Sequence, residues 1–309
     1  MKHSVRTIFA VVLGMIVSLG AYGQDLSVLM MEATCKITGP GSVGTGFVMG
    51  KPDTNDTRRA FYILITADHV LQRIQGDTAT LVLRETGPSN TWSRVEFPVQ
   101  IRRDGNPLWR KHPDVDVAAM FIGVPPNTVP RPLSTDLLVN DKELSEFEIH
   151  PGMELMCLGY PFGAEANPVG FPILRSGRIA SYPLIPTKNT RTFLFDFTVF
   201  RGNSGGPVYF VVNDPTYAGG RHIGMSIRGI IGVVVQERNI TETIQELYEK
   251  KEKTTPLRLG EVVHASFIKE LVETMGFPTK SEQPLLPPSP SILPPGTVIK
   301  SGGAELKSD

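Results

Sequence analysis

Between residues 200 and 212 the chain reads FRGNSGGPVYFVV, a serine among three glycines, then a proline and an apolar run. Glycines beside Ser204 let the backbone take positive φ and aim successive N–H groups at one spot, as an oxyanion hole requires. The same letters would also serve as a plain loop between two strands. The sequence therefore predicts Ser204 as a candidate nucleophile, with a strand following it.

The segment also matches the G-x-S-x-G nucleophile elbow of α/β-hydrolases, which places a helix after the serine. Here Val208–Val212 is a β-branched and aromatic run that reads as a strand. No acid followed by a histidine in a turn-like setting is found downstream. The α/β-hydrolase reading is therefore disfavoured.

Working outward, the chain consists of short apolar runs separated by Gly, Pro, Asn and Asp, which is typical of antiparallel β-barrels and sandwiches. The expected strands of the first half are Met31–Thr38, Gly44–Met49, Ala60–Thr66, Ala79–Arg84, Trp92–Arg102 and Val115–Ile122. Those of the second half are Met153–Gly159, Phe171–Ser181, Thr192–Thr198, Pro207–Val212, Arg228–Gln236 and Leu259–His264. Six expected strands in each half predict an all-β chain of two similar domains.

The proline-containing stretch Pro125–Pro151 is expected to link the two domains. Two helices are also predicted. Glu242–Lys253 is mostly charged and reads as a surface insertion, whereas Ala265–Met275 has one apolar face and is expected to pack against the core.

Both ends of the chain read as segments outside the fold. Lys2 and Arg6 precede the apolar run Ile8–Leu19, followed by small residues up to Gly23. This run is too short for a membrane anchor, so residues 1–23 are predicted to be a secretory signal peptide, giving a periplasmic or secreted protein without stable membrane insertion. Residues 279–309 are rich in proline and predict a flexible tail.

Charge and cysteine content exclude other classes of function. The 31 basic and 31 acidic residues balance, which argues against a nucleic-acid binder. Only two cysteines are present, Cys35 and Cys157, so the fold cannot depend on a disulfide framework. Export would permit one bridge between them, but the strand-like setting slightly favours buried free thiols.

A serine hydroxyl needs a base to take its proton, and His69 has the best setting among the histidines because it follows the apolar strand Phe61–Ile65. A lone semi-buried histidine is the alternative reading. Asp116 opens an apolar strand, where a carboxylate needs a hydrogen-bonding partner, and would hold the imidazole. Asp114 reads as a turn acid, and Asp68 would point away from His69 on an extended strand.

The resemblance to a known family lies in the segments Thr66–Val70, Asp116–Ala118 and Gly202–Pro207. With the order His69, Asp116, Ser204, they resemble the active-site motifs of trypsin-like serine peptidases. Further similarity to the bacterial HtrA/DegP-type branch lies in Gly44–Val48, Leu158–Gly163, Arg175–Ile179 and Val262–Ile268. The resemblance covers about residues 31 to 275. No PDZ-like domain follows Met275, so the peptide-triggered activation of that branch is not implied.

The resemblance implies a chymotrypsin-like peptidase domain over 24–278, with two six-stranded antiparallel β-barrels (about 28–124 and 152–278), a linker over 125–151 and a C-terminal helix. It further implies an exported serine endopeptidase acting on peptides or unfolded proteins without a metal or organic cofactor. Its oxyanion hole would lie at Gly202, Asn203 and Ser204, with the N–H groups supplied by Gly202 and Ser204. The implied specificity pocket consists of Thr198, Val234, Val235 and Glu237.

Because no acidic residue stands at Thr198, we expect small or medium apolar side chains before the cleaved bond. Two other functions stay open. One is a silent domain of this fold that binds peptides between the barrels. The other is an envelope-associated protein whose Pro-rich tail binds partners. No oligomeric state is predicted.

Overall fold

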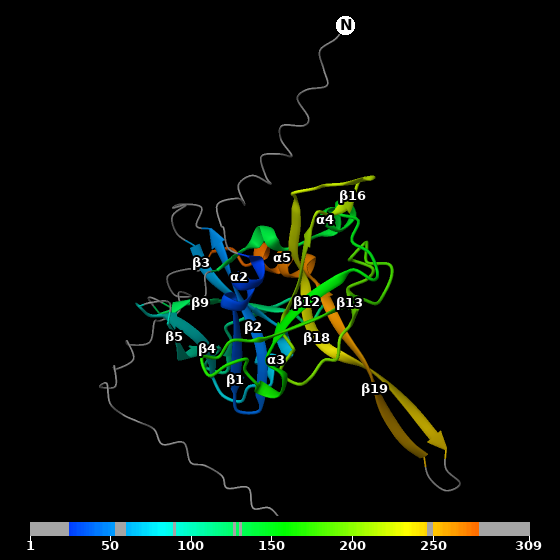
Figure 1. Ribbon diagram of the computed structural model, residues 1–309. Helices are drawn as coiled ribbons and strands as arrows, with labels where there is room; N and C mark the ends of the chain where they lie inside the picture. The colour runs from blue at the N-terminus through cyan, green and yellow to red at the C-terminus, as the bar shows by residue number, and fades with distance from the viewer. Residues whose placement is uncertain are drawn as a thin grey trace, which may run out of the picture.

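Two β-structures, one from each half of the chain, meet along a shared buried face (Figure 1). The computed structural model describes residues 25–52, 60–88, 91–125, 128–129, 132–245 and 250–277. The predicted signal peptide and the Pro-rich tail lie outside these residues. The all-β class predicted from the sequence is confirmed.

The first half forms a nine-stranded sheet of order β10-β4-β1-β2-β3-β9-β8, with β11 beside β2 and β5 beside β4. Its strands are β1 (Thr34–Gly39), β2 (Ser42–Pro52), β3 (Ala60–Thr66), β4 (Thr78–Thr86), β5 (Trp92–Gln100), β8 (Arg110–Lys111), β9 (Ala118–Ile122), β10 (Thr128–Val129) and β11 (Leu133–Ser134).

The expected closure of this half into a six-stranded barrel is not observed. The chain between β5 and β9 forms the small β6–β7 ladder (Arg102–Arg103 and Asn106–Pro107) and then β8. In the described part of the chain β5 pairs with β4 alone and β8 pairs with β9 alone. The strands β5 and β8 therefore do not pair with each other to close a barrel.

The second half closes as predicted into a six-stranded barrel of order β12-β13-β14-β19-β18-β15. These strands are β12 (Glu154–Gly159), β13 (Ile173–Ile179), β14 (Thr192–Asp196), β15 (Pro207–Asn213), β18 (Ser226–Gln245) and β19 (Lys250–His264). A short ladder of β16 (Thr216–Tyr217) and β17 (Gly220–Arg221) stands apart from the barrel.

The predicted helix over Glu242–Lys253 is wrong for residues 242–245 and 250–253, and residues 246–249 lie outside the described part of the chain. The ends of β18 and β19 continue there as an antiparallel arm that projects from the barrel (Figure 1), with Glu242 opposite Lys253. The β-branched residues Ile240, Thr241, Thr243 and Ile244 favour strand over helix and outweigh the charged residues between them.

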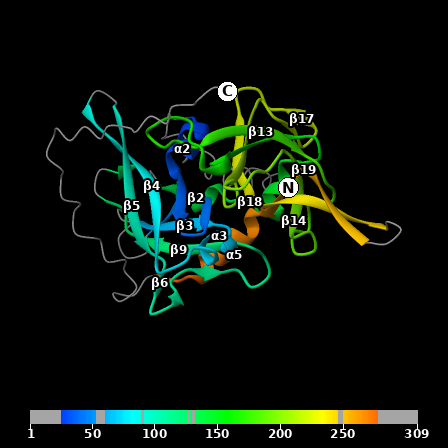
Figure 2. The same ribbon diagram turned by 90° about the horizontal axis from the view of Figure 1, so that it is seen from below.

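Helices cover the junction between the two halves (Figure 2). The first is α2 (Leu26–Ala33), which replaces the first part of the strand expected at Met31–Thr38; the Asp25 carboxylate caps it by accepting from the Ser27 N–H at 2.8 Å. The last is α5 (Ala265–Thr274), predicted correctly, which buries Phe267, Ile268 and Leu271. Shorter helices are α3 (Asp68–Gln72), η3 (Thr135–Leu137), α4 (Asp141–Glu146) and η4 (Pro161–Gly163).

Two apolar clusters form the core. One fills the space between the first sheet, α2 and α5, and extends to Tyr209, Val233 and Val263 of the barrel. The other lies inside the barrel around Phe193, Phe195 and Phe210. Because the first cluster contains residues of both halves, the junction between them is held by buried apolar packing.

Candidate active site

His69 and Asp116 meet because of the strand pairing in the first sheet. β3 ends at Thr66, directly opposite Ala118 at the start of β9. The residues just after β3 and just before β9 are therefore neighbours. His69 Nδ1 lies 2.6 Å from Asp116 Oδ2, and the His69 backbone N–H donates to Asp116 Oδ1 at 3.0 Å.

The Asp116 carboxylate is held ionised by these contacts. Burial alone would raise its pKa, but the hydrogen bonds and the charge of the His69 ring, with the backbone N–H groups of His69 and Asp68, lower the pKa below its ordinary value. An ionised Asp116 accepts a hydrogen bond from a protonated Nδ1 of His69. In the neutral imidazole this leaves Nε2 without a proton, so that Nε2 can accept one.

The two neighbouring aspartates have other partners. Asp68 begins α3 rather than ending a strand, and its carboxylate accepts from Trp109 Nε1 at 2.7 Å and from Gln72 Nε2 at 2.5 Å. Asp114 forms an exposed ion pair with Arg191 at 3.4 Å. Asp116 alone among the three contacts the His69 ring.

Ser204 follows a tight turn. The Asn203 N–H donates to the Phe200 carbonyl at 3.0 Å, and Gly202 has φ +99°. These are the marks of a type II turn with glycine at its third position, which orients the peptide between Arg201 and Gly202 opposite to its orientation in a type I turn. The N–H groups of Gly202 and Ser204 donate to no acceptor within the described residues, whereas that of Asn203 is used in the turn.

The glycines around Ser204 are required by close packing as well as by conformation. A Cβ on Gly202 would lie 2.1 Å from the Tyr160 carbonyl oxygen, and one on Gly205 would lie 2.0 Å from that of Thr45. A Cβ on Gly206 would lie 2.2 Å from the Leu158 carbonyl oxygen. This segment is therefore wedged between the two halves, and a side chain at any of the three glycine positions would meet a backbone carbonyl.

The Ser204 hydroxyl donates to the Val235 carbonyl at 3.1 Å rather than to the His69 ring. Catalytic hydrogen bonds are often absent or long before a substrate binds, and the serine χ1 rotates freely between staggered positions. Ser204 Oγ has to leave Val235 before it can donate to His69.

Thr45 is a supporting residue that the sequence reasoning missed. It is fully buried on β2, and its hydroxyl donates to the Gly202 carbonyl at 2.6 Å and accepts from the Tyr160 N–H at 3.3 Å. Its backbone N–H donates to the Ser204 carbonyl at 2.9 Å. The only sequence signal was a threonine between two glycines in an apolar strand, where a buried hydroxyl needs a partner.

His69, Asp116, Gly202 and Ser204 line one pocket of about 600 Å³ at the junction of the two halves. Of the predicted specificity residues, Val235 and Glu237 line this pocket, as do Val199 and Phe200. Thr198 does not line it; its carbonyl accepts from Arg175 at 2.7 Å. Val234 is buried inside the barrel, and its backbone pairs with Gly205 and Gly206.

The sequence reasoning also missed Arg73 and Gln236, which line the pocket. Within the described residues, no cluster of three or more His, Cys, Asp or Glu side chains is suited to a metal. Cys35 and Cys157 are both buried and free, as the sequence slightly favoured. No helix of the described part is long and apolar enough to span a bilayer.

Comparison with known proteins gives a weak structural likeness. No protein-family model matches the chain, and no curated protein matches it. Two crystal structures of Rv3671c are similar to it in fold. One, an inactive serine-to-alanine mutant from M. tuberculosis H37Rv, has 18% identity and a TM-score of 0.42, over 82% of this chain and 91% of that one. The other, of the Rv3671c protease in its inactive form, has 18% identity and a TM-score of 0.39, over 82% of this chain and 93% of that one.

Proposed function

We propose that this chain is a serine endopeptidase in which Ser204 is the nucleophile, His69 the general base and Asp116 the residue that orients His69. The observation that carries the proposal is one pocket holding three features: the 2.6 Å contact between His69 and Asp116, Ser204, and the unengaged N–H groups of Gly202 and Ser204. A nucleophile, a base, its orienting acid and an oxyanion site are the parts that acyl transfer requires.

The reaction begins when Ser204 Oγ leaves the Val235 carbonyl and turns toward His69 Nε2. Oγ attacks the peptide carbonyl carbon while its proton passes to Nε2, and the N–H groups of Gly202 and Ser204 stabilise the negative oxygen. His69 then gives the proton to the leaving amine as the C–N bond breaks. Water, deprotonated by His69, hydrolyses the acyl-enzyme and restores Ser204.

The proposal extends to the substrate and the location of the enzyme. Val199 and Val235 in the pocket support a preference for a small or medium apolar side chain before the cleaved bond. Peptides and unfolded proteins are the proposed substrates. Residues 1–23 would direct the chain out of the cytoplasm to the periplasm or medium, and the motif resemblance supports the HtrA/DegP-type branch.

The test is cleavage of an unstructured protein by the purified mature chain, with the product termini identified by mass spectrometry. We expect cuts after Ala, Val or Leu that vanish in Ser204→Ala and in His69→Ala. Asp116→Asn should lower kcat by about 10⁴ because it favours the wrong imidazole tautomer. Asp114→Asn is the matched control and should leave kcat unchanged. Cleavage that persists in Ser204→Ala would contradict the mechanism, and cuts after Lys or Arg would contradict the preference.

A further inference from the structure

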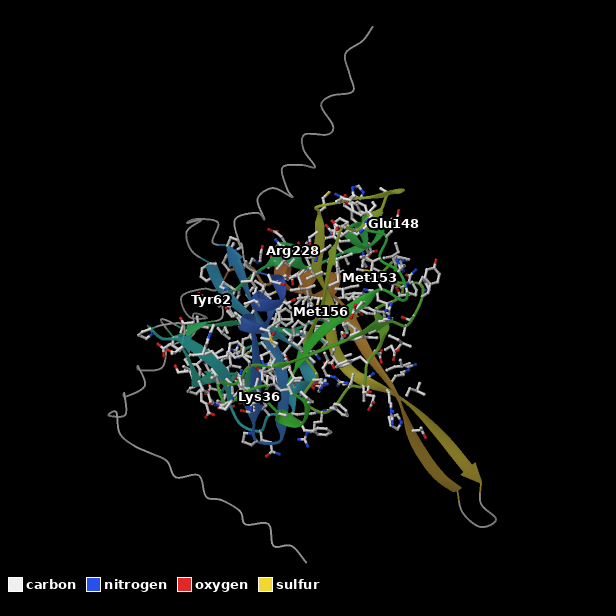
Figure 3. The ribbon with its side chains drawn as sticks, viewed as in Figure 1. Lys36, Tyr62, Glu148, Met153, Met156 and Arg228 are labelled. Carbon is white, nitrogen blue, oxygen red and sulfur yellow. The ribbon has the colours of Figure 1, made fainter. Side chains whose placement is uncertain are left out.

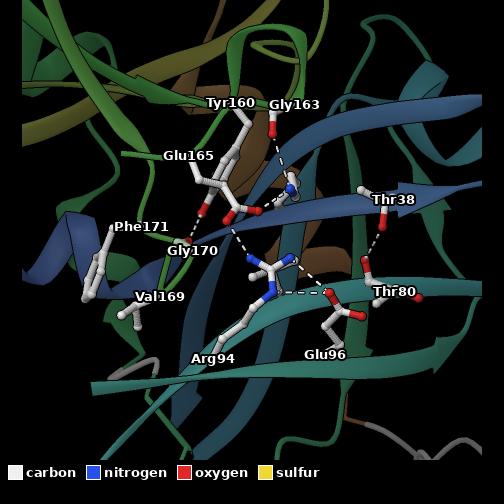
Figure 4. Close-up of polar contacts among 12 residues, drawn as sticks. Thr38, Thr80, Arg94, Glu96, Tyr160, Gly163, Glu165, Val169, Gly170 and Phe171 are labelled. Atoms are coloured by element: carbon white, nitrogen blue, oxygen red, sulfur yellow. Dashed lines mark hydrogen bonds and ion pairs between the residues drawn. The ribbon is translucent and has the colours of Figure 1, made fainter. Parts of the chain in front are cut away.

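We propose that Glu165 is a positioning residue, which anchors the loop beneath the candidate oxyanion site to the first sheet and so keeps that site formed. This inference rests on the proposed function and adds a residue that does not line the pocket of His69 and Ser204. It is carried by an ion-paired cluster between the two halves of the chain, shown in Figure 4.

The loop between β12 and β13 contacts the turn before Ser204. The Phe162 N–H donates to the Arg201 carbonyl at 2.6 Å. The rings of Phe162 and Phe200 lie 5.1 Å apart, and the Tyr160 carbonyl occupies the space where a Gly202 side chain would be. These contacts hold the carbonyl of Arg201 on one side and thereby direct the N–H of Gly202 to the other, because both belong to the same planar peptide.

The same loop is tied to the first sheet through Glu165. One carboxylate oxygen accepts from Lys36 Nζ of β1, and the other accepts from Arg94 Nη1 of β5 at 2.5 Å. Lys36 also donates to the Gly163 carbonyl at 3.2 Å. In the view of Figure 3, Lys36 lies on the first sheet, below Met156 of the barrel.

Glu165 and Lys36 are shielded from solvent, with side-chain exposures of 15% and 13%. Charge-assisted hydrogen bonds in such a setting are stronger than those on an open surface. Burial alone would raise the pKa of Glu165, but the bonds and charges of Lys36 and Arg94 lower it below its ordinary value. The carboxylate is thus ionised throughout the neutral range.

The rest of the loop is held by buried groups that do not depend on Glu165. Arg84 Nη1 donates to the Gly170 carbonyl at 2.9 Å, and the Tyr160 hydroxyl donates to the same oxygen at 3.0 Å. Removing the Glu165 charge should therefore loosen the segment around Phe162 and Gly163 while the fold persists. The peptide between Arg201 and Gly202 then becomes free to reverse, which withdraws one oxyanion donor.

The test compares rates of covalent labelling by a fluorophosphonate in the full mature chain. We expect Glu165→Gln to label at least tenfold more slowly than the native chain, since losing one oxyanion donor costs about 10²–10³. Glu165→Asp keeps the charge and should recover part of the rate. Glu96→Gln is the matched control, because Glu96 pairs with the same Arg94 at 3.0 Å but forms no hydrogen bond or ion pair with the loop within the described residues. It should label within twofold of native.

Steady-state cleavage of a peptide separates positioning from a general loss of structure. Glu165→Gln should lower kcat with KM unchanged, and its unfolding midpoint should show that it is folded at the assay temperature. If that variant does not fold, Arg94→Gln breaks the same ion pair from the other side and should show the same drop in kcat.

Native protein that labels at the same rate as Glu165→Gln and Arg94→Gln would overturn this inference alone. Native protein that does not label would overturn the proposed function and this inference together.

Discussion

Replacing Gly202 by alanine isolates the oxyanion donor at the candidate site. A Cβ there would lie 2.1 Å from the Tyr160 carbonyl oxygen, where ordinary contacts are 3.4–4 Å. The backbone φ of +99° adds a penalty of about 1–2 kcal/mol for an L-residue. A change to a type I turn would relieve both the close contact and the unfavourable φ, because the third residue of that turn has a negative φ.

That change reverses the peptide between residues 201 and 202 and removes one N–H from the pocket. Loss of one such donor costs about 10²–10³ in rate, or about 2.7–4 kcal/mol of transition-state stabilisation. We therefore expect Gly202→Ala to slow acylation by a p-nitrophenyl ester by that factor, with only a small fall in Tm because the turn relaxes.

The assay is the pre-steady-state burst of p-nitrophenol, measured together with thermal unfolding. Gly105→Ala is the matched control: Gly105 also has positive φ, +76°, but nothing lies within 4 Å of its Cβ position. That variant should lose about 1 kcal/mol of stability and no acylation rate. A Gly202→Ala burst within threefold of native, with unchanged Tm, would refute the reasoning.

Three further predictions concern buried polar and ionisable groups. Arg84 is fully buried and donates to the carbonyls of Glu32 at 2.7 Å and Thr34 at 2.5 Å, so Arg84→Met should cost about 3–5 kcal/mol in urea unfolding because buried acceptors lose their partner; a cost under 1 kcal/mol would contradict this. Burial lowers the pKa of His264 from 6.5 to about 4. The unfolded chain therefore binds the extra proton between those values, and stability should fall by about 3 kcal/mol as pH drops through that window. His264→Phe should remove this fall, and equal pH dependence of stability in the variant and the native protein would contradict the prediction. Burial raises the pKa of Cys35 and Cys157 to about 12, so neither thiol should react with Ellman's reagent at pH 8 until the chain is unfolded; fast reaction of the native protein would be the contrary result.

The strands could be predicted where turn residues bound a β-branched run on both sides. Ala60–Thr66 and the start of β15 at Pro207 were predicted at the observed positions. Met31–Thr38 reads wholly as a strand because apolar and polar residues alternate along it, which is the period of a half-buried strand. The Asp25 cap that begins α2 lies outside that segment, so the segment alone carries no sign of the helix.

His69, Asp116 and Ser204 could be singled out because each is a polar residue within a few positions of an apolar strand, β3, β9 or β15. Their supports could not. Thr45 and Gly202 lie 157 positions apart in the sequence, and Lys36 and Glu165 lie 129 apart. Such contacts depend on how the two halves meet, which local pattern and propensity do not specify.

The most direct test of an activated Ser204 is intact-mass detection of fluorophosphonate labelling, which requires no knowledge of the substrate. The account predicts one label per native molecule, none on Ser204→Ala, and retention of labelling in the surface variant Asp114→Asn. Native protein that gains no label, or Ser204→Ala that gains one, would contradict the assignment of Ser204 as the nucleophile activated by His69.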